Sequence, residues 1–455
     1  MNKYKFKHII LFMMNLIEMC CLTALFAVVW FNYYGYINNK PIYYKNGNIL
    51  IFLMYAVLIL VFFVLYDGFR IATLTSTNII YSQTIAMIMV NVLAYGILSL
   101  LAYRLQNAVP MIFLCLMQIS VIFIFTMLSK SIYDYIYPPR KVLMIYGGNS
   151  SVNTLIAKMF SRRDRYIIAA TLKTTNLSVV KEKVKDYEAV VLCDVTGDFR
   201  NAVISYCFKK SIRVYLTPTV EDILLKGSND ISTFDTPLFL IKGKNLNFEQ
   251  RVVKRFSDII ISLIGIILTA PIMIVTAILI KAYDGGPALF KQVRSTLDGK
   301  DFMIYKFRSM ITDAEADGKA RFASVNDSRI TPIGNVIRRF RIDELPQLFN
   351  ILKGDMAVVG PRPERPEIIN ELLKEMPEFS YRMKVKAGLT GYSQVIGRYN
   401  TTLGDKLKMD LMYIENYSLY MDLKIIMLTI KILFMKESTE GVSEENSVFK
   451  TESQE

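Results

Sequence analysis

Four long apolar segments dominate the first 130 residues of the chain. They run from Ile9 to Phe31, Ile49 to Tyr66, Ile85 to Tyr103 and Val109 to Leu128. Each approaches the ~20 apolar residues that a helix needs to cross the hydrocarbon core of a bilayer. The pattern therefore predicts a four-helix transmembrane bundle over residues 9–130.

The positions of Lys and Arg around these segments predict their orientation. One set of flanks carries Lys3, Lys5, Lys7, Arg70, Lys130, Arg140 and Lys141, whereas the other set carries Lys40, Lys45 and Arg104. Short cytoplasmic flanks are enriched in Lys and Arg. We therefore expect both ends of the bundle to face the cytoplasm.

After residue 140 the pattern changes to short aliphatic strands that alternate with helical stretches. The expected strands are Lys141–Gly148, Tyr166–Leu172, Ala189–Val195 and Ile212–Pro218. Such alternation is typical of a parallel sheet, so residues 141–241 are predicted to form a Rossmann-like α/β domain. Its first turn, Gly147–Val152, lacks the GxGxxG spacing of a dinucleotide site, which favours a structural or regulatory role over nucleotide binding.

A fifth apolar segment, residues 257–280, contains Pro271 near its middle and has basic residues on both sides. A full crossing would place one basic cluster outside the cell, against the usual bias. A proline-broken hairpin keeps both clusters in the cytoplasm, and its two arms are each too short to span the bilayer. We expect a re-entrant helix-break-helix with its break at Pro271; the alternative is a kinked fifth span.

Composition narrows the possible chemistry. Of the 455 residues, 53% are hydrophobic and the formal net charge is +14, which suits anionic lipid, a phosphorylated substrate or nucleic acid. The basic residues flank apolar segments and form no aromatic-interleaved stripe, so we expect no nucleic-acid partner. The single histidine, His8, lies in the N-terminal flank, and the five cysteines form no CxxC motif. These facts argue against a Ser/His/Asp triad, a histidine-ligated metal, a zinc knuckle and a disulfide framework.

The segment from Tyr305 to Gly397 carries the candidate chemistry. Asp343 and Glu344 follow three arginines and precede Pro346. If a helix begins here, its positive end and the guanidinium groups keep Asp343 ionised and favour a phosphate nearby. Such a carboxylate can attack phosphorus or hold Mg²⁺. The alternative is that Asp343 is only a helix N-cap.

Three further cations complete the candidate anion site. Arg362 stands between two prolines, which present its planar fork of donors in a restricted position. Lys306 and Arg308 alternate on one face of an expected strand, where a solvated strand edge is the alternative interpretation. Together these residues predict an anion site at a membrane surface.

The run from Arg251 to about Met435 resembles the bacterial sugar transferases that are polyprenyl-phosphate hexose-1-phosphate transferases. The resemblance is carried, in order, by YKFRSM, RIDELPQL, LKGDM, VGPRPE and GLTG, at residues 305–310, 341–348, 352–356, 359–364 and 388–391. The four expected spans and the α/β domain are similar to the larger members of that family. The resemblance implies a mainly α catalytic domain over residues 251–436, followed by an acidic, Ser-rich tail at 437–455 that we expect to be disordered.

The resemblance also implies an activity. It is transfer of hexose-1-phosphate from a UDP-sugar to undecaprenyl phosphate, with Mg²⁺ and a ping-pong route through a phosphosugar-enzyme intermediate, as the first step of capsule, exopolysaccharide or O-antigen synthesis. Asp343 matches the nucleophile and Glu344 its partner; both could hold the metal. Arg338 and Arg362 match phosphate-binding arginines, and Pro271 matches the helix-breaking proline, although Ala270 stands where serine is frequent.

The implied setting is the bacterial cytoplasmic membrane, with the active site on the cytoplasmic side and with surfaces for a possible homodimer. Two rival functions stay open. One is a polyprenyl-phosphate glycosyltransferase that releases UDP. The other is a non-catalytic membrane regulator that uses the α/β domain as a sensor.

Overall fold

A computed structural model describes residues 6–37, 40–41, 45–174, 176–231, 235–241, 243, 246–311, 329–397 and 401–433. The expected disordered tail at 437–455 lies outside these residues. The described chain divides into two compact units at Thr217 and Pro218. Each unit is described by itself below.

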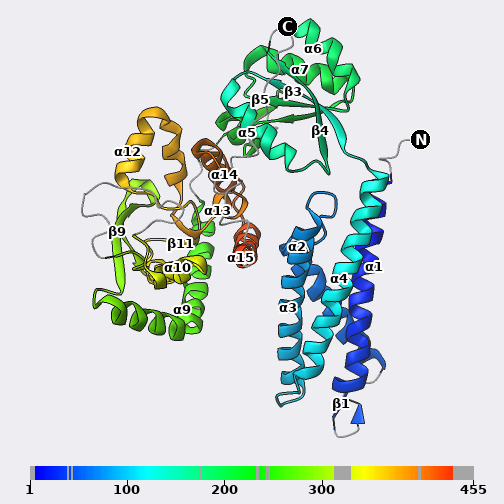
Figure 1. Cartoon of the computed structure of the whole chain (residues 1–455), viewed down its shortest axis with the longest axis vertical. Helices are drawn as coiled ribbons and strands as arrows, with labels where there is room; N and C mark the ends of the chain where they lie inside the picture. The colour runs from blue at the N-terminus through cyan, green and yellow to red at the C-terminus, as the bar shows by residue number, and fades with distance from the viewer. Residues whose placement is uncertain are drawn as a thin grey trace. The chain divides into compact units, whose positions relative to one another are not determined.

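Four apolar helices form the N-terminal bundle, as the sequence predicts (Figure 1). They are α1 Lys7–Val29, α2 Lys45–Leu65, α3 Ser76–Leu101 and α4 Val109–Ile136, and the short strands β1 Tyr36–Ile37 and β2 Lys40–Pro41 follow α1. Gln118 of α4 joins all four helices, because its Nε2 donates to the Leu22 carbonyl at 3.1 Å and to the Tyr55 hydroxyl at 3.0 Å, and its Oε1 accepts from Asn91 at 2.9 Å. Buried amides of this kind must be satisfied inside a membrane bundle, which fixes how the helices pack.

The predicted parallel sheet is confirmed. Its strands are β3 Arg140–Tyr146, β4 Tyr166–Lys173, β5 Ala189–Cys193 and β6 Arg213–Leu216, in the spatial order β4-β3-β5-β6. Helix α5 Asn149–Phe160 covers one face, and α6 Leu177–Lys183 and α7 Gly197–Lys209 cover the other. Gly147 is required where β3 ends, because a Cβ there would lie 2.3 Å from the Asp194 carbonyl oxygen.

The second unit begins earlier than the sequence boundary at residue 241. Helix α8 Val220–Lys226 packs on α14 Leu403–Glu415, and Ile223 belongs to the core of this unit. The antiparallel hairpin of β7 Asn229–Ile231 and β8 Leu238–Leu240 follows α8. The segment after β6 therefore packs with the C-terminal half of the chain.

The C-terminal unit is mainly helical, with two small sheets. Strands β9 Leu289–Ser295 and β10 Asp301–Phe307 pair antiparallel, and β11 Ala357–Val359 and β12 Gly388–Thr390 pair parallel. Around them lie α9 Phe248–Asp284, α10 Pro332–Arg339, α11 Gln347–Lys353, α12 Pro366–Glu375, α13 Tyr392–Ile396, α14 and α15 Leu419–Leu433. One buried cluster that includes Ile351, Met356 and Leu411 forms the core.

Helix α9 corrects one expectation about the fifth apolar segment. The sequence predicts two helical arms broken at Pro271, but the helix is continuous from Phe248 to Asp284 and has Pro271 in its interior. Figure 1 shows that α9 changes direction sharply along its length. Proline removes one helical hydrogen bond and bends the helix, and the apolar residues on both sides let helical geometry continue. Thr269 adds a side-chain hydrogen bond to the Gly265 carbonyl at 2.7 Å.

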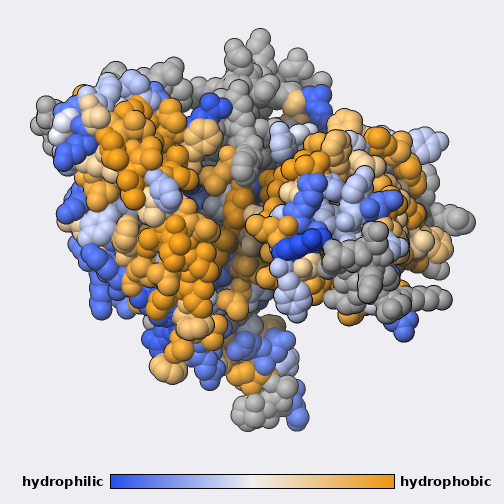
Figure 2. Space-filling model, turned by 90° about the horizontal axis from the view of Figure 1, so that it is seen from below, coloured by the Kyte–Doolittle hydropathy of each residue, from blue (hydrophilic) through white to orange (hydrophobic). Residues whose placement is uncertain are grey.

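The part of α9 after Pro271 has a wide apolar exposure. Ile274 is 60% exposed and Ile278 is 61% exposed, whereas Met273 and Ile280 pack against Phe307 of β10. Seen from below, this side of the unit is largely hydrophobic (Figure 2). By length and composition α9 is the fifth helix of the described chain that could cross a membrane.

Candidate active site

Asp343 and Glu344 lie in a short 3₁₀ helix, Ile342–Glu344, between α10 and α11. Asp343 caps no helix, because α11 has Pro346 at its N-cap and no side-chain capping bond. The expected helix start is thus displaced by three residues. The interpretation of Asp343 as a plain N-cap is wrong.

The backbone before the dyad is strained. Arg341 has φ 54°, in the left-handed region that non-glycine residues rarely adopt. Such a conformation costs of order 1–3 kcal/mol and persists where surrounding contacts impose it. This strained residue directly precedes the 3₁₀ helix that carries the two carboxylates.

Glu344 is held by three cations. Its Oε1 lies 3.2 Å from Arg362 Nη2 and 3.6 Å from Lys306 Nζ, and its Oε2 lies 3.6 Å from Arg341 Nη1. Burial alone would raise the pKa of Glu344, but Arg362, Lys306 and Arg341 lower it to about 2. Glu344 is therefore ionised at neutral pH and paired with these cations.

Asp343 has the opposite environment. Among the described residues its carboxylate makes no hydrogen bond and no ion pair. Burial and the neighbouring charge of Glu344 raise the pKa of Asp343 to about 6, against the opposing pull of Lys306, Arg338 and Arg362. An ionised carboxylate with no partner of its own is available for attack or for a cation.

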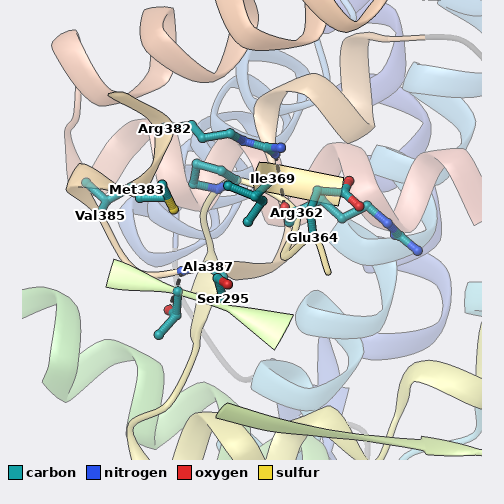
Figure 3. A pocket seen from close by; sticks show the side chains of 10 residues that line it. Ser295, Arg362, Glu364, Ile369, Arg382, Met383, Val385 and Ala387 are labelled. Atoms are coloured by element: carbon teal, nitrogen blue, oxygen red, sulfur yellow. Dashed lines mark hydrogen bonds between the residues drawn. The ribbon is translucent and has the colours of Figure 1, made fainter. Parts of the chain in front are cut away.

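Arg362 is presented by the Pro361–Pro363 segment, as the sequence predicts for a restricted backbone. Its Nη1 donates to Gln394 Oε1 at 3.3 Å, while Nη2 contacts Glu344. Arg382 donates to the Arg362 carbonyl at 3.0 Å across a small pocket (Figure 3). The side chain of Arg362 is 44% exposed, so one edge of the guanidinium can still take an anion.

The other three predicted cations differ in whether they have an ion-pair partner. Arg338, on α10, has no partner among the described residues and lies close enough to Asp343 to lower its pKa. Lys306 faces Glu344, and its own pKa is lowered by burial. Arg308 is 8% exposed and pairs instead with Asp284, where its Nη1 lies 2.8 Å from Oδ2. Of the predicted site residues, Arg308 therefore stands apart from the dyad.

Sequence reasoning counts Arg341 among the three arginines before the dyad without giving it a contact, and it misses Gln394. Arg341 contacts Glu344 from three residues before it, a spacing that brings side chains together within one helical turn. Gln394 follows the GLTG motif in the sequence and reaches Arg362 only through the fold. Nothing local in the sequence indicates Gln394.

The donor set fits magnesium only together with a substrate. Among the described residues, no three His, Cys, Asp or Glu side chains gather as a metal cluster. Asp343 offers unpartnered carboxylate oxygens beside those of Glu344. Mg²⁺ is commonly held by one or two carboxylates plus the phosphates of a substrate, so this pair can supply the protein ligands.

Comparison with known proteins identifies the family of the chain. Residues 249–436 match the family model described as bacterial sugar transferase. The uncharacterized sugar transferase EpsL of Bacillus subtilis is 38% identical over 197 residues, which is 93% of that protein and 43% of this chain. The chain belongs to the bacterial sugar transferase family. Asp343, Glu344 and Arg362 all lie within the matched region.

Longer members of the family match over the same part of the chain. An Aeromonas hydrophila UDP-N-acetylgalactosamine-undecaprenyl-phosphate N-acetylgalactosaminephosphotransferase is 44% identical over 184 residues, 40% of this chain and 43% of that protein. A Klebsiella pneumoniae UDP-glucose:undecaprenyl-phosphate glucose-1-phosphate transferase is 39% identical over 219 residues, 47% of this chain and 45% of that protein. The chain thus spans less than half the length of these two relatives.

Proposed function

We propose that this sugar transferase moves hexose-1-phosphate from a UDP-sugar to undecaprenyl phosphate and releases UMP, as the first step of polysaccharide assembly. The observation that carries the proposal is the difference in environment between the two adjacent carboxylates. Glu344 is neutralised by three cations, while Asp343 is ionisable, unpartnered and beside them. The names of the Aeromonas and Klebsiella relatives supply the substrate classes.

In the first half-reaction an Asp343 carboxylate oxygen attacks the phosphorus that bears the sugar. A bond forms between that oxygen and the phosphorus as the bond from phosphorus to the bridging oxygen breaks. The bridging oxygen leaves with UMP and its electron pair. Arg362 and Arg338 offset the negative charge on the transferring and leaving oxygens.

In the second half-reaction an oxygen of undecaprenyl phosphate attacks the same phosphorus. The bond to Asp343 breaks, the carboxylate is regenerated, and the sugar leaves as a lipid diphosphate. No net proton transfer is required in either half. The absence of histidine from residues 9–455 is therefore no obstacle to this chemistry.

Magnesium, when bound by Asp343 or Glu344 and the diphosphate, would neutralise phosphate charge and favour departure of UMP. The chain's own contribution is geometric. Glu344 keeps Lys306, Arg341 and Arg362 in place around the reacting phosphate. The sequence assigns Arg308 to the same phosphate site. In this proposal Arg308 does not bind the phosphate and instead pairs with Asp284 at the end of α9.

We place the reaction on the cytoplasmic side of the bacterial cytoplasmic membrane. Pro271 bends α9, and the apolar residues after the bend would rest in the bilayer beside the lipid acceptor. A bent helix that enters and leaves on one side keeps both basic flanks in the cytoplasm. The site would then meet a soluble nucleotide and a lipid phosphate at the same depth.

The test is the nucleotide product together with the loss of the nucleophile. With a UDP-sugar and undecaprenyl phosphate, the purified protein should release UMP, and Asp343→Asn should lower release to the background. Asp298→Asn is the matched control, because Asp298 is exposed in a turn with φ 55° that asparagine also accepts. It should keep the wild-type rate.

The outcomes separate the rival functions. Release of UDP would indicate a glycosyltransferase that leaves the phosphate behind. No nucleotide release with any UDP-sugar of a panel would favour a membrane regulator. Undiminished UMP release by Asp343→Asn would refute the assignment of the nucleophile.

A further inference from the structure

Near its start, the apolar helix α9 carries charged side chains that are buried in the catalytic unit. Lys254 is 5% exposed and Asp258 is 4% exposed, and Arg255 is partly buried between them. Buried charges are costly unless each has a partner. The partners of Arg255 and Asp258 lie on α11 and β11, next to the active-site segments, whereas the partners of Lys254 lie on α14 and α15.

Asp258 holds the strand that leads to Arg362. Its Oδ1 accepts the backbone N–H of Val358 at 2.9 Å, in a buried contact. Strand β11 pairs with β12 through neighbouring groups, such as the Ala357 N–H to the Ala387 carbonyl at 2.8 Å. The Val358 N–H is donated to α9 instead. Four residues further along the chain the backbone presents Arg362.

Arg255 holds α11, the helix that follows the Asp343–Glu344 pair. Its Nη1 donates to the Ile351 carbonyl at 2.6 Å and its Nη2 to the Leu352 carbonyl at 2.7 Å. These carbonyls belong to the last turn of α11, where a cation is favourable. The dyad lies immediately before the first turn of that helix.

Lys254 attaches the same turn of α9 to the C-terminal helices. Its Nζ lies 2.7 Å from Asp422 Oδ2, and Tyr413 donates its hydroxyl to the other oxygen of that carboxylate at 2.7 Å. Both partners are buried. The α9 turn is therefore anchored to α14 and α15, and the Tyr413 hydroxyl also contacts the Val359 carbonyl of β11 at 3.3 Å.

We propose that Asp258 is a positioning residue of the transferase reaction, which sets the place of Arg362 relative to Glu344 through the Val358 N–H. The inference rests on the proposed function. One turn of α9 holds the Arg362 side through Asp258 and the dyad side through Arg255. The 3.2 Å contact between Arg362 and Glu344 is the result of these two attachments. The geometry of the site is thereby tied to the membrane helix.

A double-mutant cycle on the full chain tests this role. The measured quantity is the rate at which a UDP-sugar carrying a radiolabelled β-phosphate labels the protein in the absence of acceptor. Asp258→Val should slow labelling by about 100-fold, because a small misplacement of a binding group has effects of that size. Asp258→Asn keeps an acceptor oxygen and should stay within about threefold of wild type, since only a charge is removed.

The decisive comparison is made in the Arg362→Ala background. If Asp258 acts through Arg362, Asp258→Val should cost less than about threefold there, because coupled residues are not additive. Equal losses in both backgrounds would overturn the proposal. So would an Asp258→Asn protein as slow as Asp258→Val, since that would assign the effect to charge. Arg251→Gln, on the exposed face one turn earlier, is the control and should label normally.

A second variant covers the case in which Asp258→Val does not fold. Asp258→Glu keeps the charge and the acceptor but lengthens the side chain, and should slow labelling by about tenfold in the wild-type background only. Equal slowing with and without Arg362 contradicts the proposal. Failure of the wild-type protein to label would instead contradict the phosphosugar intermediate, so the two failures are distinguishable.

Discussion

At the scale of single residues, two adjacent carboxylates have opposite properties because their neighbours differ. Glu344 forms ion pairs with Arg362, Lys306 and Arg341, whereas Asp343 has no ion-pair or hydrogen-bond partner among the described residues. The cations lower the pKa of Glu344 to about 2, and burial beside Glu344 raises the pKa of Asp343 to about 6. The function we propose uses this division, since one group organises cations and the other reacts.

The raised pKa of Asp343 predicts a stability effect of pH. Folding raises the pKa of Asp343 from its usual value of 3.8 to about 6, so the carboxyl group is harder to ionise in the folded protein than in the unfolded chain. The folded state therefore loses stability as pH rises from 3.8 through 6, by about 1–3 kcal/mol. In magnesium-free buffer, Asp343→Asn should melt at a higher temperature than wild type at pH 7.5.

The gain in melting temperature should shrink as the pH falls and vanish below about pH 3, where Asp343 is protonated in both states. Thermal melts at several pH values check this, with Asp298→Asn as the exposed control. A melting temperature of Asp343→Asn below that of wild type at pH 7.5 would show that Asp343 is a stabilising ion rather than a reactive one.

The site residues that the sequence identified are those with local signals. Arg362 was found from its two prolines and Asp343 from the arginines before it, and the fold brings both to one place. Gln394 and Asp258 carry no such signal, because each contacts the site from a distant part of the chain. Arg308 is a different case. Strand alternation predicts the face of the strand on which Arg308 lies, but it does not predict that Arg308 pairs with Asp284.

At the scale of elements, the hydrophobic pattern was enough to predict the four N-terminal apolar helices and the parallel sheet. Length and apolar content identify spanning helices, and β-branched runs between helices identify buried parallel strands. The pattern was not enough for α9. Proline marks where a helix bends, but tertiary packing of Met273 and Ile280 decides that helical geometry continues beyond it.

The bend in α9 predicts that both of its ends lie on the cytoplasmic side. Arg251 and Tyr283 are both exposed, near the two ends of the helix. Cysteine introduced as Arg251→Cys or Tyr283→Cys should react with a membrane-impermeant maleimide only in inside-out vesicles. The unsubstituted protein, with its five native cysteines, gives the background.

Reaction of the two cysteines from opposite sides of the membrane would establish the fifth-span alternative. Pro271→Ala sharpens the test, because it restores the missing hydrogen-bond donor and removes the steric cause of the bend. We expect this substitution to increase labelling of Tyr283→Cys from the opposite side.

At the scale of the whole molecule, the described parts of the site are contained in the second compact unit. Asp343, Arg362 and the α9 contacts all lie within residues 218–442. The family match at residues 249–436 lies within this unit, and EpsL is matched over 93% of its length. The bundle and the parallel sheet supply none of the described contacts of the dyad.

A chain that begins at Pro218 should therefore keep UMP release within about tenfold of the full protein, a difference of roughly 1.4 kcal/mol in activation free energy. Nucleotide release in detergent and in vesicles checks this. A shortened protein that inserts and melts cooperatively but releases no UMP would show that the first unit contributes to catalysis.

The central claim is that Asp343 becomes covalently bound to phosphosugar. Its most direct measurement is mass spectrometry of the protein after incubation with a UDP-sugar and magnesium, without lipid acceptor, followed by peptide mapping. The account predicts a mass increase of one hexose-phosphate on the peptide that contains Asp343, and its loss when undecaprenyl phosphate is added. An adduct on another residue, or UMP release to the lipid product with no adduct at any time, would contradict it.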